Sequence, residues 1–307
     1  LIKILRHDQL TPAARRIAEQ VAKRMDTVTS LGRMGLNLLS ILHIMLGNRL
    51  MKALAGRLRS LSGNRLPMWT PAMPKGGESI ARRSIGSGAT DAVVYFPSCI
   101  NRGMGPTGRT GADALNIKTE SLLLKAGFAV SYPEHMDRLC CGMPFASKGI
   151  FETADQKALE LGDALLKVSD NGRIPILCDM SPCLYHMKET LDPRLQLFEP
   201  IEFTLKFLAP RLEFQKVSGT VAIHTVCSAK KMGLEADFLK LAEMCAEKVI
   251  APEIICCGFA GDRGFNVPEL NAFGLRRLKP QLPSDVQSGY STSRTCEIGL
   301  NTHSGIN

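Results

Sequence analysis

The tripeptide Cys-Cys-Gly occurs twice in the sequence, and it constrains the fold more than any other feature. Adjacent cysteines point their side chains in different directions, so a shared ligand requires the backbone to turn there, and the following glycine permits that turn. A lone cysteine precedes each pair and another follows it. This repeated order predicts an internal duplication. Eight of the ten cysteines fall into it: Cys99, Cys140, Cys141 and Cys183 in the first copy, and Cys227, Cys256, Cys257 and Cys296 in the second.

The length of 307 residues allows two domains, each with its own hydrophobic core. Disulfide-rich secreted scaffolds are typically short, whereas this chain can fold by hydrophobic burial alone, so a disulfide framework is disfavoured. Residues 1–30 are polar and contain no apolar block with a secretory cleavage site. We therefore expect a cytoplasmic protein with free thiols. The chain starts at Leu1 and not at Met, so we expect it to be a piece of a longer protein.

Positive charge is concentrated at the start of the chain. The net charge is +9, yet residues 1–90 hold 15 Lys and Arg against 4 Asp and Glu, and the remainder carries a net charge of −2. The apolar run over residues 34–46 is shorter than the roughly 20 residues that cross a bilayer. With its basic neighbours, segment 31–60 is expected either to lie on an anionic membrane surface or, the favoured interpretation, to pack on another domain. Nucleic acid is not an expected partner, because no aromatic stacking motif accompanies the basic residues.

Short apolar runs followed by cysteines predict an α/β fold with two tandem, duplicated domains and short, mostly parallel sheets. For the first copy we predict strands over 92–96, 128–130 and 174–177, and helices over 114–126 and 151–168. For the second we predict strands over 221–223, 254–255 and 286–290, and helices over 234–249 and 267–278. The predicted division is a basic helical connector (1–60), a Pro- and Gly-rich linker that Trp69 anchors (61–91), a first cysteine-rich domain (92–215) and a second (216–307), which is expected to be truncated at its C-terminus.

The patterned cysteines follow the predicted strands, at the edge where open α/β sheets bind ligands. Thiolates are the natural ligands of iron–sulfur clusters and of structural zinc, so each group of four predicts a 4Fe-4S-type cluster or a zinc ion. Cys178 is a possible further ligand of the first group, and Cys245 is expected in the core of a helix. No catalytic residue is expected, since the sequence has no dinucleotide-binding loop and no Ser/His/Asp constellation. Three histidines are expected to support the ligands, to replace a missing ligand or, the favoured interpretation, to be hydrogen-bonded loop residues: His186, His224 and His303.

The double unit resembles the cysteine-rich CCG domain pair of FAD-linked, iron–sulfur D-lactate dehydrogenases. It is also similar to the iron–sulfur component of glycolate oxidases and to the CCG component of heterodisulfide reductases. The resemblance covers residues 92–305 and is most specific in segments 140–149 and 256–265. The chain departs from that family at Met180 and Ser293, where the family unit has the first cysteine of a Cys-x-x-Cys pair. This departure disfavours a noncubane double cluster of the heterodisulfide reductase type.

The resemblance implies an iron–sulfur electron-transfer module of a membrane-associated, FAD-dependent D-2-hydroxyacid dehydrogenase, with D-lactate as the expected substrate. It implies that FAD and a ferredoxin-like domain lie upstream, outside this sequence. It further implies a position on the inner face of the cytoplasmic membrane, and a quinone or a cytochrome as the electron acceptor. Two other functions remain open from the residues themselves: a disulfide-handling protein like heterodisulfide reductase, and a structural zinc platform for docking.

Overall fold

The computed structural model describes residues 2–78, 80, 91–107 and 113–306. Residues 79 and 81–90 of the predicted linker lie outside the described residues, as do residues 108–112 of the first predicted domain. The chain divides into two compact units, which are described separately. In described residues, the first unit contains 2–32, 77–78, 80, 91–103 and 113–212, and the second contains 33–76, 104–107 and 213–306.

The first unit is built on a four-stranded parallel sheet with the strand order β2-β1-β3-β4. The central strand β1 is buried from Val93 to Phe96, where no residue is more than 1% exposed. A continuous apolar run of this kind is typical of a parallel strand covered on both faces. The short edge strand β4 was not predicted. The strands are β1 (Asp91–Phe96), β2 (Phe128–Ser131), β3 (Ile176–Cys178) and β4 (Leu197–Phe198).

Helices connect these strands at nearly the predicted positions. Helix α7 has the predicted bounds, and its apolar face is buried. A one-turn α6 follows the first Cys-Cys-Gly turn, and a short π-helix follows α9. The helical elements between the strands are α4 (Cys99–Gly103), α5 (Leu115–Lys125), η1 (Met136–Arg138), α6 (Met143–Ala146), α7 (Phe151–Val168), α8 (Ser181–Thr190), α9 (Pro200–Phe203) and η2 (Thr204–Leu208).

The first two helices of the chain, α1 (Ile2–Asp8) and α2 (Pro12–Lys23), belong to the first unit. Helix α2 starts at Pro12, because the Thr11 hydroxyl accepts a hydrogen bond from the Ala14 backbone N–H at 3.2 Å and proline is favoured at the first helical position. Its buried face joins one hydrophobic cluster with two of the patterned cysteines. That cluster contains Ala18, Ala22, Met25, Cys99, Cys140, Phe145, Ala146, Ile150 and Ala154.

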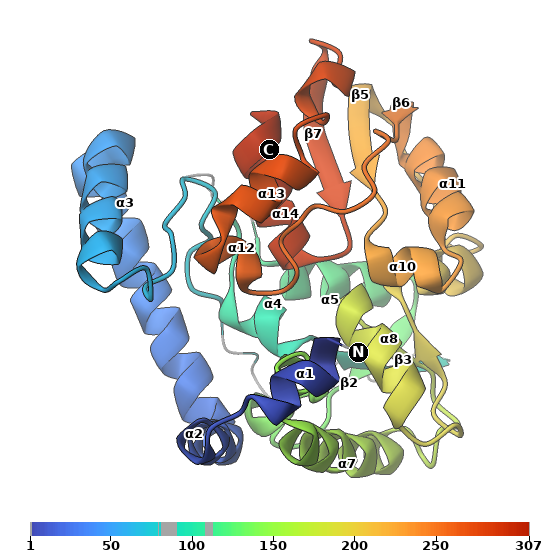
Figure 1. Ribbon diagram of the computed structural model, residues 1–307. Coiled ribbons are helices and arrows are strands. Elements are labelled where there is room, and N and C mark those ends of the chain that lie inside the picture. The colour runs from blue at the N-terminus through green and yellow to red at the C-terminus, as the bar shows by residue number, and fades with distance from the viewer. Residues whose placement is uncertain (1, 79, 81–90, 108–112, 307) are drawn as a thin grey trace. The chain divides into compact units, whose positions relative to one another are not determined.

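The second unit repeats the same topology with fewer strands. Its parallel sheet has the order β6-β5-β7, with the first strand of the repeat again in the centre (Figure 1). The equivalent strands of the first unit have the same order, β2-β1-β3. The elements are β5 (Val217–His224), α10 (Cys227–Lys231), α11 (Glu235–Cys245), β6 (Ala246–Ile250), α12 (Arg263–Asn266), α13 (Pro268–Gly274), η3 (Lys279–Gln281), β7 (Val286–Ser291) and α14 (Arg294–Ser304).

The prediction of a strand over residues 254–255 was wrong. Helix α11 ends at Cys245, and β5 pairs on one side with β6, which overlaps the end of the helix predicted to run to residue 249. A short segment with this composition fits either helix or strand by periodicity, and pairing with β5 decides between them. Cys245 is therefore the last residue of its helix and is partly exposed, and not a core residue within it.

Helix α3 (Met25–Leu61) continues from the first unit into the second. Its helical geometry is interrupted at Gly47, which has a φ of 68°. By length and composition alone, the whole of α3 could cross a membrane. The expectation that this region is too short to do so considered only the apolar run over residues 34–46. Core helices of soluble proteins and signal sequences pass the same test.

The described part of the predicted linker packs on the second unit. Trp69 is 7% exposed and lies edge-on to the His43 ring, with 4.9 Å between the ring centroids. The Met68 backbone N–H donates to the Phe265 carbonyl at 2.7 Å, and Ala72 joins the hydrophobic cluster that contains Cys257. Hydrophobic burial therefore holds residues 68–72 in place, as the anchoring role predicted for Trp69 requires.

Candidate functional site

Both sheets place cysteines at the carboxyl ends of the central strand and of one neighbour. In the first unit, Cys99 follows β1 and opens α4, while Cys178 ends β3 and Cys183 lies in the first turn of α8. In the second unit, Cys227 opens α10 after β5, and Cys296 lies in the first turn of α14 after β7. In the first sheet the chain goes from β1 to β2 on one side and from β3 to β4 on the other, and in the second it goes from β5 to β6 with β7 on the other side of β5. Such switch points between neighbouring strands are where open α/β sheets bind ligands.

The cysteines of the first copy are neighbours of one another. The Cys99 and Cys140 sulfurs are 4.0 Å apart, and the thiols of Cys140 and Cys141 and of Cys141 and Cys183 are hydrogen-bonded pairs. All four are buried, as is Cys178, whose thiol lies 4.0 Å from the Met180 carbonyl. We call Cys99, Cys140, Cys141 and Cys183 the first thiol group.

Gly142 makes the turn that brings two adjacent cysteines into one group. Its φ is 86°, and a Cβ built on it would lie 2.4 Å from the Ala154 carbonyl oxygen of α7. Only glycine accepts both the left-handed backbone and so close an approach. The turn after Cys141 is therefore packed directly against α7.

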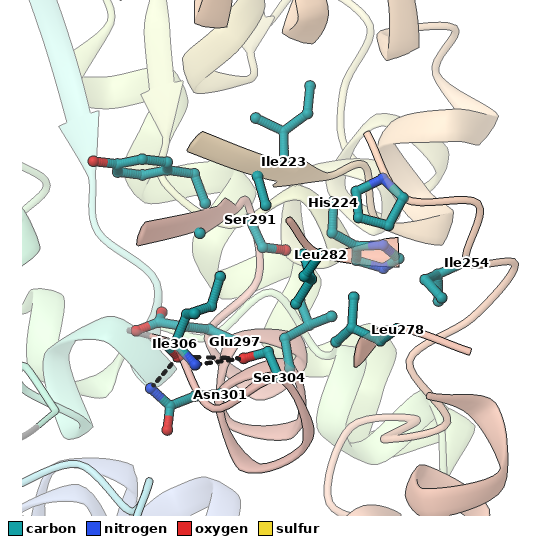
Figure 2. A pocket seen from close by; sticks show the side chains of 15 residues that line it. Ile223, His224, Ile254, Leu278, Leu282, Ser291, Glu297, Asn301, Ser304 and Ile306 are labelled. Atoms are coloured by element: carbon teal, nitrogen blue, oxygen red, sulfur yellow. Dashed lines mark hydrogen bonds between the residues drawn. The ribbon is translucent and has the colours of Figure 1, made fainter. Parts of the chain in front are cut away.

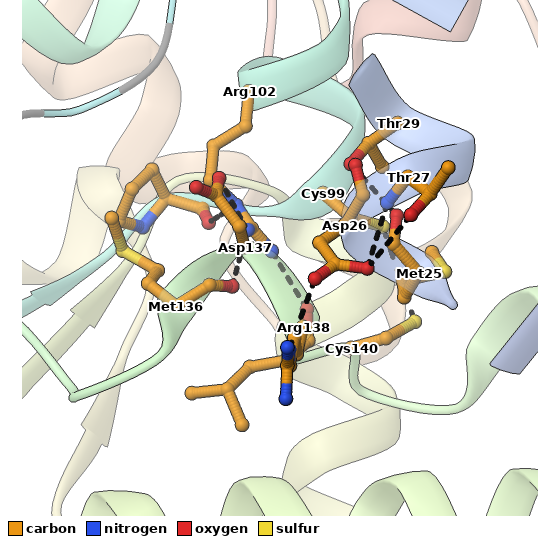
Figure 3. Close-up of polar contacts among 12 residues, drawn as sticks. Met25, Asp26, Thr27, Thr29, Cys99, Arg102, Met136, Asp137, Arg138 and Cys140 are labelled. Carbon is orange, nitrogen blue, oxygen red and sulfur yellow. Dashed lines mark hydrogen bonds and ion pairs between the residues drawn. The ribbon is translucent and has the colours of Figure 1, made fainter. Parts of the chain in front are cut away.

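Arg102 connects the loops that carry Cys99 and Cys140, and sequence reasoning did not single it out. Arg102 is 3% exposed. Its Nε donates to the Pro97 carbonyl at 3.1 Å, and its Nη2 donates to the Leu139 carbonyl at 2.7 Å (Figure 3). Its Nη1 donates to the Met136 carbonyl. Asp137 adds an ion pair at 3.7 Å. A buried guanidinium whose donors are used in this way fixes loop geometry and puts a positive charge beside the thiols.

Asp179 is a second buried group that the sequence did not reveal. One carboxylate oxygen accepts from the Ser98 backbone N–H at 2.8 Å and the other from the Tyr95 hydroxyl at 2.9 Å. The Asn101 amide donates to the Asp179 carbonyl at 3.1 Å. Burial raises the pKa of Asp179, and these hydrogen bonds oppose the rise. The network joins the start of α4 to the end of β3, the two segments that carry Cys99 and Cys178.

The beginning of α3 is tied to the same region of the first unit. Asp26 accepts a hydrogen bond from the Thr27 backbone N–H at 2.7 Å and an ion pair from Arg138 Nε at 3.0 Å (Figure 3). These contacts lower the pKa of the Asp26 carboxyl, the bond from Thr27 having the largest effect. Arg138 precedes the Leu139-Cys140 segment, so the N-terminal helices contact the loop that carries the cysteine pair.

The cysteines of the second copy form an equivalent cluster, the second thiol group. The Cys257 thiol donates to the Cys296 sulfur at 3.1 Å, and Cys227 is hydrogen-bonded to Cys256. The Gly258 backbone N–H donates to the Cys256 sulfur at 3.3 Å. In contrast to the first group, Cys227 and Cys256 are exposed, and Cys296 is half-buried. The second group is therefore open to solvent on one side.

Gly258 repeats the role of Gly142. Its φ is 71°, and a Cβ there would lie 2.2 Å from the Leu270 carbonyl oxygen of α13. The Asn271 amide also donates to the Cys257 carbonyl at 2.6 Å. Each Cys-Cys-Gly turn is thus held against the second helix that follows it, α7 in the first unit and α13 in the second.

The two groups differ in electrostatics. In the first, hydrogen bonding to Cys140 and burial raise the pKa of Cys99, and hydrogen bonding to Cys141 raises the pKa of Cys140 to about 12. In the second, the hydrogen bond from Cys227 lowers the pKa of Cys256, and the bond from Cys257 lowers that of Cys296. The raised pKa values of the first group favour protonated thiols, whereas the second group combines raised pKa values at Cys227 and Cys257 with lowered ones at Cys256 and Cys296.

Among the described residues, no hydrogen bond joins any of the three predicted histidines to a thiol. His186 and His224 are buried, and the Nε2 atom of each has no hydrogen-bond partner in the part of the chain described. Burial lowers the pKa of His224 to about 4, and His224 is near enough to Cys256 to lower the pKa of that thiol. His303 lies in the last turn of α14. No contact tests whether His224 supports the thiol ligands, so this role stays a prediction.

The two thiol groups can be compared with the metal centres that thiolates bind. Sulfurs around a tetrahedral zinc ion lie about 3.8 Å apart, since each Zn–S bond is about 2.3 Å; the Cys99–Cys140 distance matches this, and the Cys257–Cys296 distance is shorter. Among the described residues, no three His, Cys, Asp or Glu side chains form a ready-made metal site. The thiol donors therefore fit zinc or an iron–sulfur centre in chemistry, and their side chains must rotate to bind either.

A comparison with protein families bears on the first unit. Residues 93–188 match the family model described as the cysteine-rich domain, CCG. The match begins within β1 and ends within α8, so it spans the whole first thiol group together with Cys178. CCG domains occur in oxidoreductases. Residues 93–188 of this chain are therefore a cysteine-rich domain of the CCG type.

Proposed function

We propose that this chain is the iron–sulfur electron-transfer module of an FAD-dependent D-2-hydroxyacid dehydrogenase, with D-lactate as the expected substrate. One observation carries the proposal: four thiols gather at the switch point of each of two sheets with the same strand order. The CCG domain over residues 93–188 supports the oxidoreductase class. The flavin and a ferredoxin-like domain would be supplied from outside this sequence.

Each thiol group has a distinct part in this proposal. Cys99, Cys140, Cys141 and Cys183 would hold one centre, with Cys178 as a further candidate, and Cys227, Cys256, Cys257 and Cys296 would hold the other. A bound iron–sulfur centre supplies one-electron transfer. The chain excludes water from the first group by burial, and Arg102 offsets the negative charge of its thiolates. The exposed second group would face the acceptor, a quinone or a cytochrome.

The first test is metal content after anaerobic purification of the intact protein. We expect iron and sulfide in both Cys140→Ser and Cys256→Ser to fall below the wild-type amount by the content of one centre, because a serine hydroxyl stays protonated and is a poor iron ligand. Cys245→Ser is the matched control, since Cys245 lies in neither group and its loss should leave the metal content unchanged. Zinc that is present in the wild type and lost in Cys140→Ser and Cys256→Ser, with iron and sulfide unchanged, would replace the electron-transfer function by a structural zinc platform.

The second test separates electron delivery from flavin chemistry in the intact protein. In Cys140→Ser and Cys256→Ser, D-lactate should still bleach the flavin in a stopped-flow trace, and a dye that accepts electrons from flavin should still turn over. Turnover with a quinone or a cytochrome should fall. Full quinone turnover after loss of the metal would contradict the proposal.

A disulfide-handling function is the second candidate, and one observation favours it. Cys227 and Cys256 are both exposed and hydrogen-bonded to each other, and the pKa of Cys256 is lowered. A solvent-accessible thiolate beside a second thiol can attack a disulfide and resolve the mixed product. Reduction of a small disulfide by the metal-free protein, lost in Cys256→Ser and kept in Cys245→Ser, would support this function.

We further propose that the protein lies on the cytoplasmic face of the membrane through residues 31–60. Large apolar side chains of α3 are exposed there, among them Met34 (67%), Leu38 (58%) and Met45 (75%), and basic residues accompany them. An apolar face with cationic neighbours binds anionic lipid surfaces. Flotation with phosphatidylglycerol vesicles should be lost in the double variant Ile41→Asp/Ile44→Asp and kept in Leu159→Asp, an exposed apolar site of α7. Equal flotation of both variants would exclude this surface.

A further inference from the structure

A pocket of the second unit lies at the switch point of its sheet. The carboxyl-terminal ends of β5 and β7 form one wall, and residues of α14 form another (Figure 2). The chain reaches Cys227 three residues after His224, the last residue of β5, and Cys296 five residues after Ser291, the last residue of β7. The pocket and the second thiol group therefore share the same two strands.

The lining is apolar except for a few polar groups. Ile223, Ile254, Leu278, Leu282 and Ile306 supply most of the hydrophobic surface (Figure 2). The cavity measures about 50 Å³, and the space reaches about 480 Å³ when the open solvent at its mouth is included. An apolar pocket with a few polar groups and an open mouth can take one edge of a flat ring and leave the rest of the molecule outside.

Two polar atoms of this lining are buried without a hydrogen-bond partner in the described structure, His224 Nε2 and Ser291 Oγ. His224 as a whole is 7% exposed. In Figure 2 both residues come from adjacent strand ends and stand over the pocket. An unpaired buried polar group costs free energy, and a bound ligand that offers acceptors would remove this cost.

The chemistry of these atoms indicates what the ligand offers. A neutral imidazole can donate from one ring nitrogen, and a serine hydroxyl can donate as well. Burial keeps His224 neutral at physiological pH, in agreement with its lowered pKa. A matching ligand therefore has carbonyl oxygens as acceptors on an otherwise apolar, planar ring.

We propose that this pocket binds the ring of a quinone, with His224 and Ser291 donating hydrogen bonds to its carbonyl oxygens. The identification of the ligand as an electron acceptor rests on the proposed function. Reduction of the quinone to the quinol consumes two electrons, which come from the hydroxyacid by way of the flavin, and two protons, which come from solvent. The pocket has an open mouth, so both the quinone and the protons can reach it.

Binding of duroquinone to the intact, oxidised protein tests this directly. Its ring is fully methylated, so it cannot add to the many thiols of the chain. Saturation-transfer NMR and calorimetry should show one saturable site. Ser291→Ala should weaken binding about fivefold, the effect of one lost hydrogen bond, and Leu282→Trp, which fills the pocket, should abolish it. Ser288→Ala on the same strand does not line the pocket and should bind as the wild type does.

The outcomes separate this site from the proposed function. Absence of saturable binding, or equal binding by Leu282→Trp and wild type, overturns the quinone site even if Cys256→Ser abolishes electron delivery. Specific binding together with full electron delivery in Cys256→Ser keeps the pocket as a quinone site and overturns the proposed function. Should Leu282→Trp fail to fold, the comparison of Ser291→Ala with Ser288→Ala decides, and equal affinities contradict the proposal.

Discussion

At the scale of single residues, the Arg102 guanidinium holds the loops before Cys99 and Cys140 together through backbone carbonyls of Pro97, Met136 and Leu139. Arg102→Met keeps most of the volume but leaves these carbonyls without their donor. We expect a loss of about 3 kcal/mol in the free energy of unfolding, measured by urea denaturation. Arg173→Met is the control, because Arg173 is exposed and pairs only with its neighbour Asp170. Equal effects of the two substitutions would show that Arg102 is not a structural link.

The buried His224 makes stability depend on pH. Its pKa of about 4 lies below the ~6.5 of an exposed imidazole, so the unfolded chain binds more protons between these values. Stability therefore rises with pH across this window, and acidification from pH 6.5 to 4 removes on the order of 3 kcal/mol. Besides burial, Lys230 lowers the pKa of His224, and Cys256 opposes the shift.

His224→Asn should flatten this dependence. We expect urea midpoints of the metal-free protein to differ less between pH 6.5 and pH 5 in the variant than in the wild type. The control is His135→Asn, because His135 is exposed and its left-handed φ of 52° is one that asparagine accepts. An unchanged pH dependence in His224→Asn would show that the imidazole is not kept neutral by burial.

At the scale of elements, the Cys-Cys-Gly turns depend on close packing against the following helix. Alanine at Gly142 or Gly258 would place its Cβ 2.4 Å or 2.2 Å from a helix carbonyl oxygen, in addition to the strain of a positive φ. Gly127 and Gly261 also have positive φ, but a Cβ there would meet no atom within 4 Å. Comparing the two kinds of site therefore separates the free-energy cost of the close contact between Cβ and the carbonyl oxygen from the cost of the positive φ.

We expect Gly142→Ala and Gly258→Ala to lose at least about 2 kcal/mol more in the free energy of unfolding than Gly127→Ala and Gly261→Ala, respectively. Thermal or urea unfolding measures both pairs. Metal uptake should fall in the first two variants only, because their turns orient the thiols. If all four variants were equally destabilised, backbone strain alone would account for the effect.

At the scale of the whole molecule, the two thiol groups differ in accessibility and in acidity. Cys227 and Cys256 are exposed and the pKa of Cys256 is lowered, whereas the first group is buried with raised pKa values. Alkylation of the metal-free protein at neutral pH, followed by peptide mass spectrometry, should modify Cys256 first and Cys99, Cys140, Cys141 and Cys183 last. Equal rates in both groups would contradict the difference in burial.

Much of the architecture could be predicted from local sequence. The repeated cysteine order predicted a duplicated α/β fold, and both sheets are parallel with equivalent strand orders. Helix α7 has its predicted bounds, because its eighteen residues keep one apolar face at helical spacing and show no alternation typical of a strand. Strand β6 was missed, since a five-residue segment takes its structure from the strand that it pairs with.

The sequence by itself determined which residues carry thiols and where the chain must turn, because the Cys-Cys-Gly order states both. Only the tertiary structure decided that α1 and α2 pack on the first unit while most of α3 belongs to the second, and that Arg102 and Asp179 support the first thiol group. It also decided that one group is buried and the other exposed. Burial and hydrogen bonding between distant segments depend on which surfaces meet, and residue spacing along the chain does not encode this.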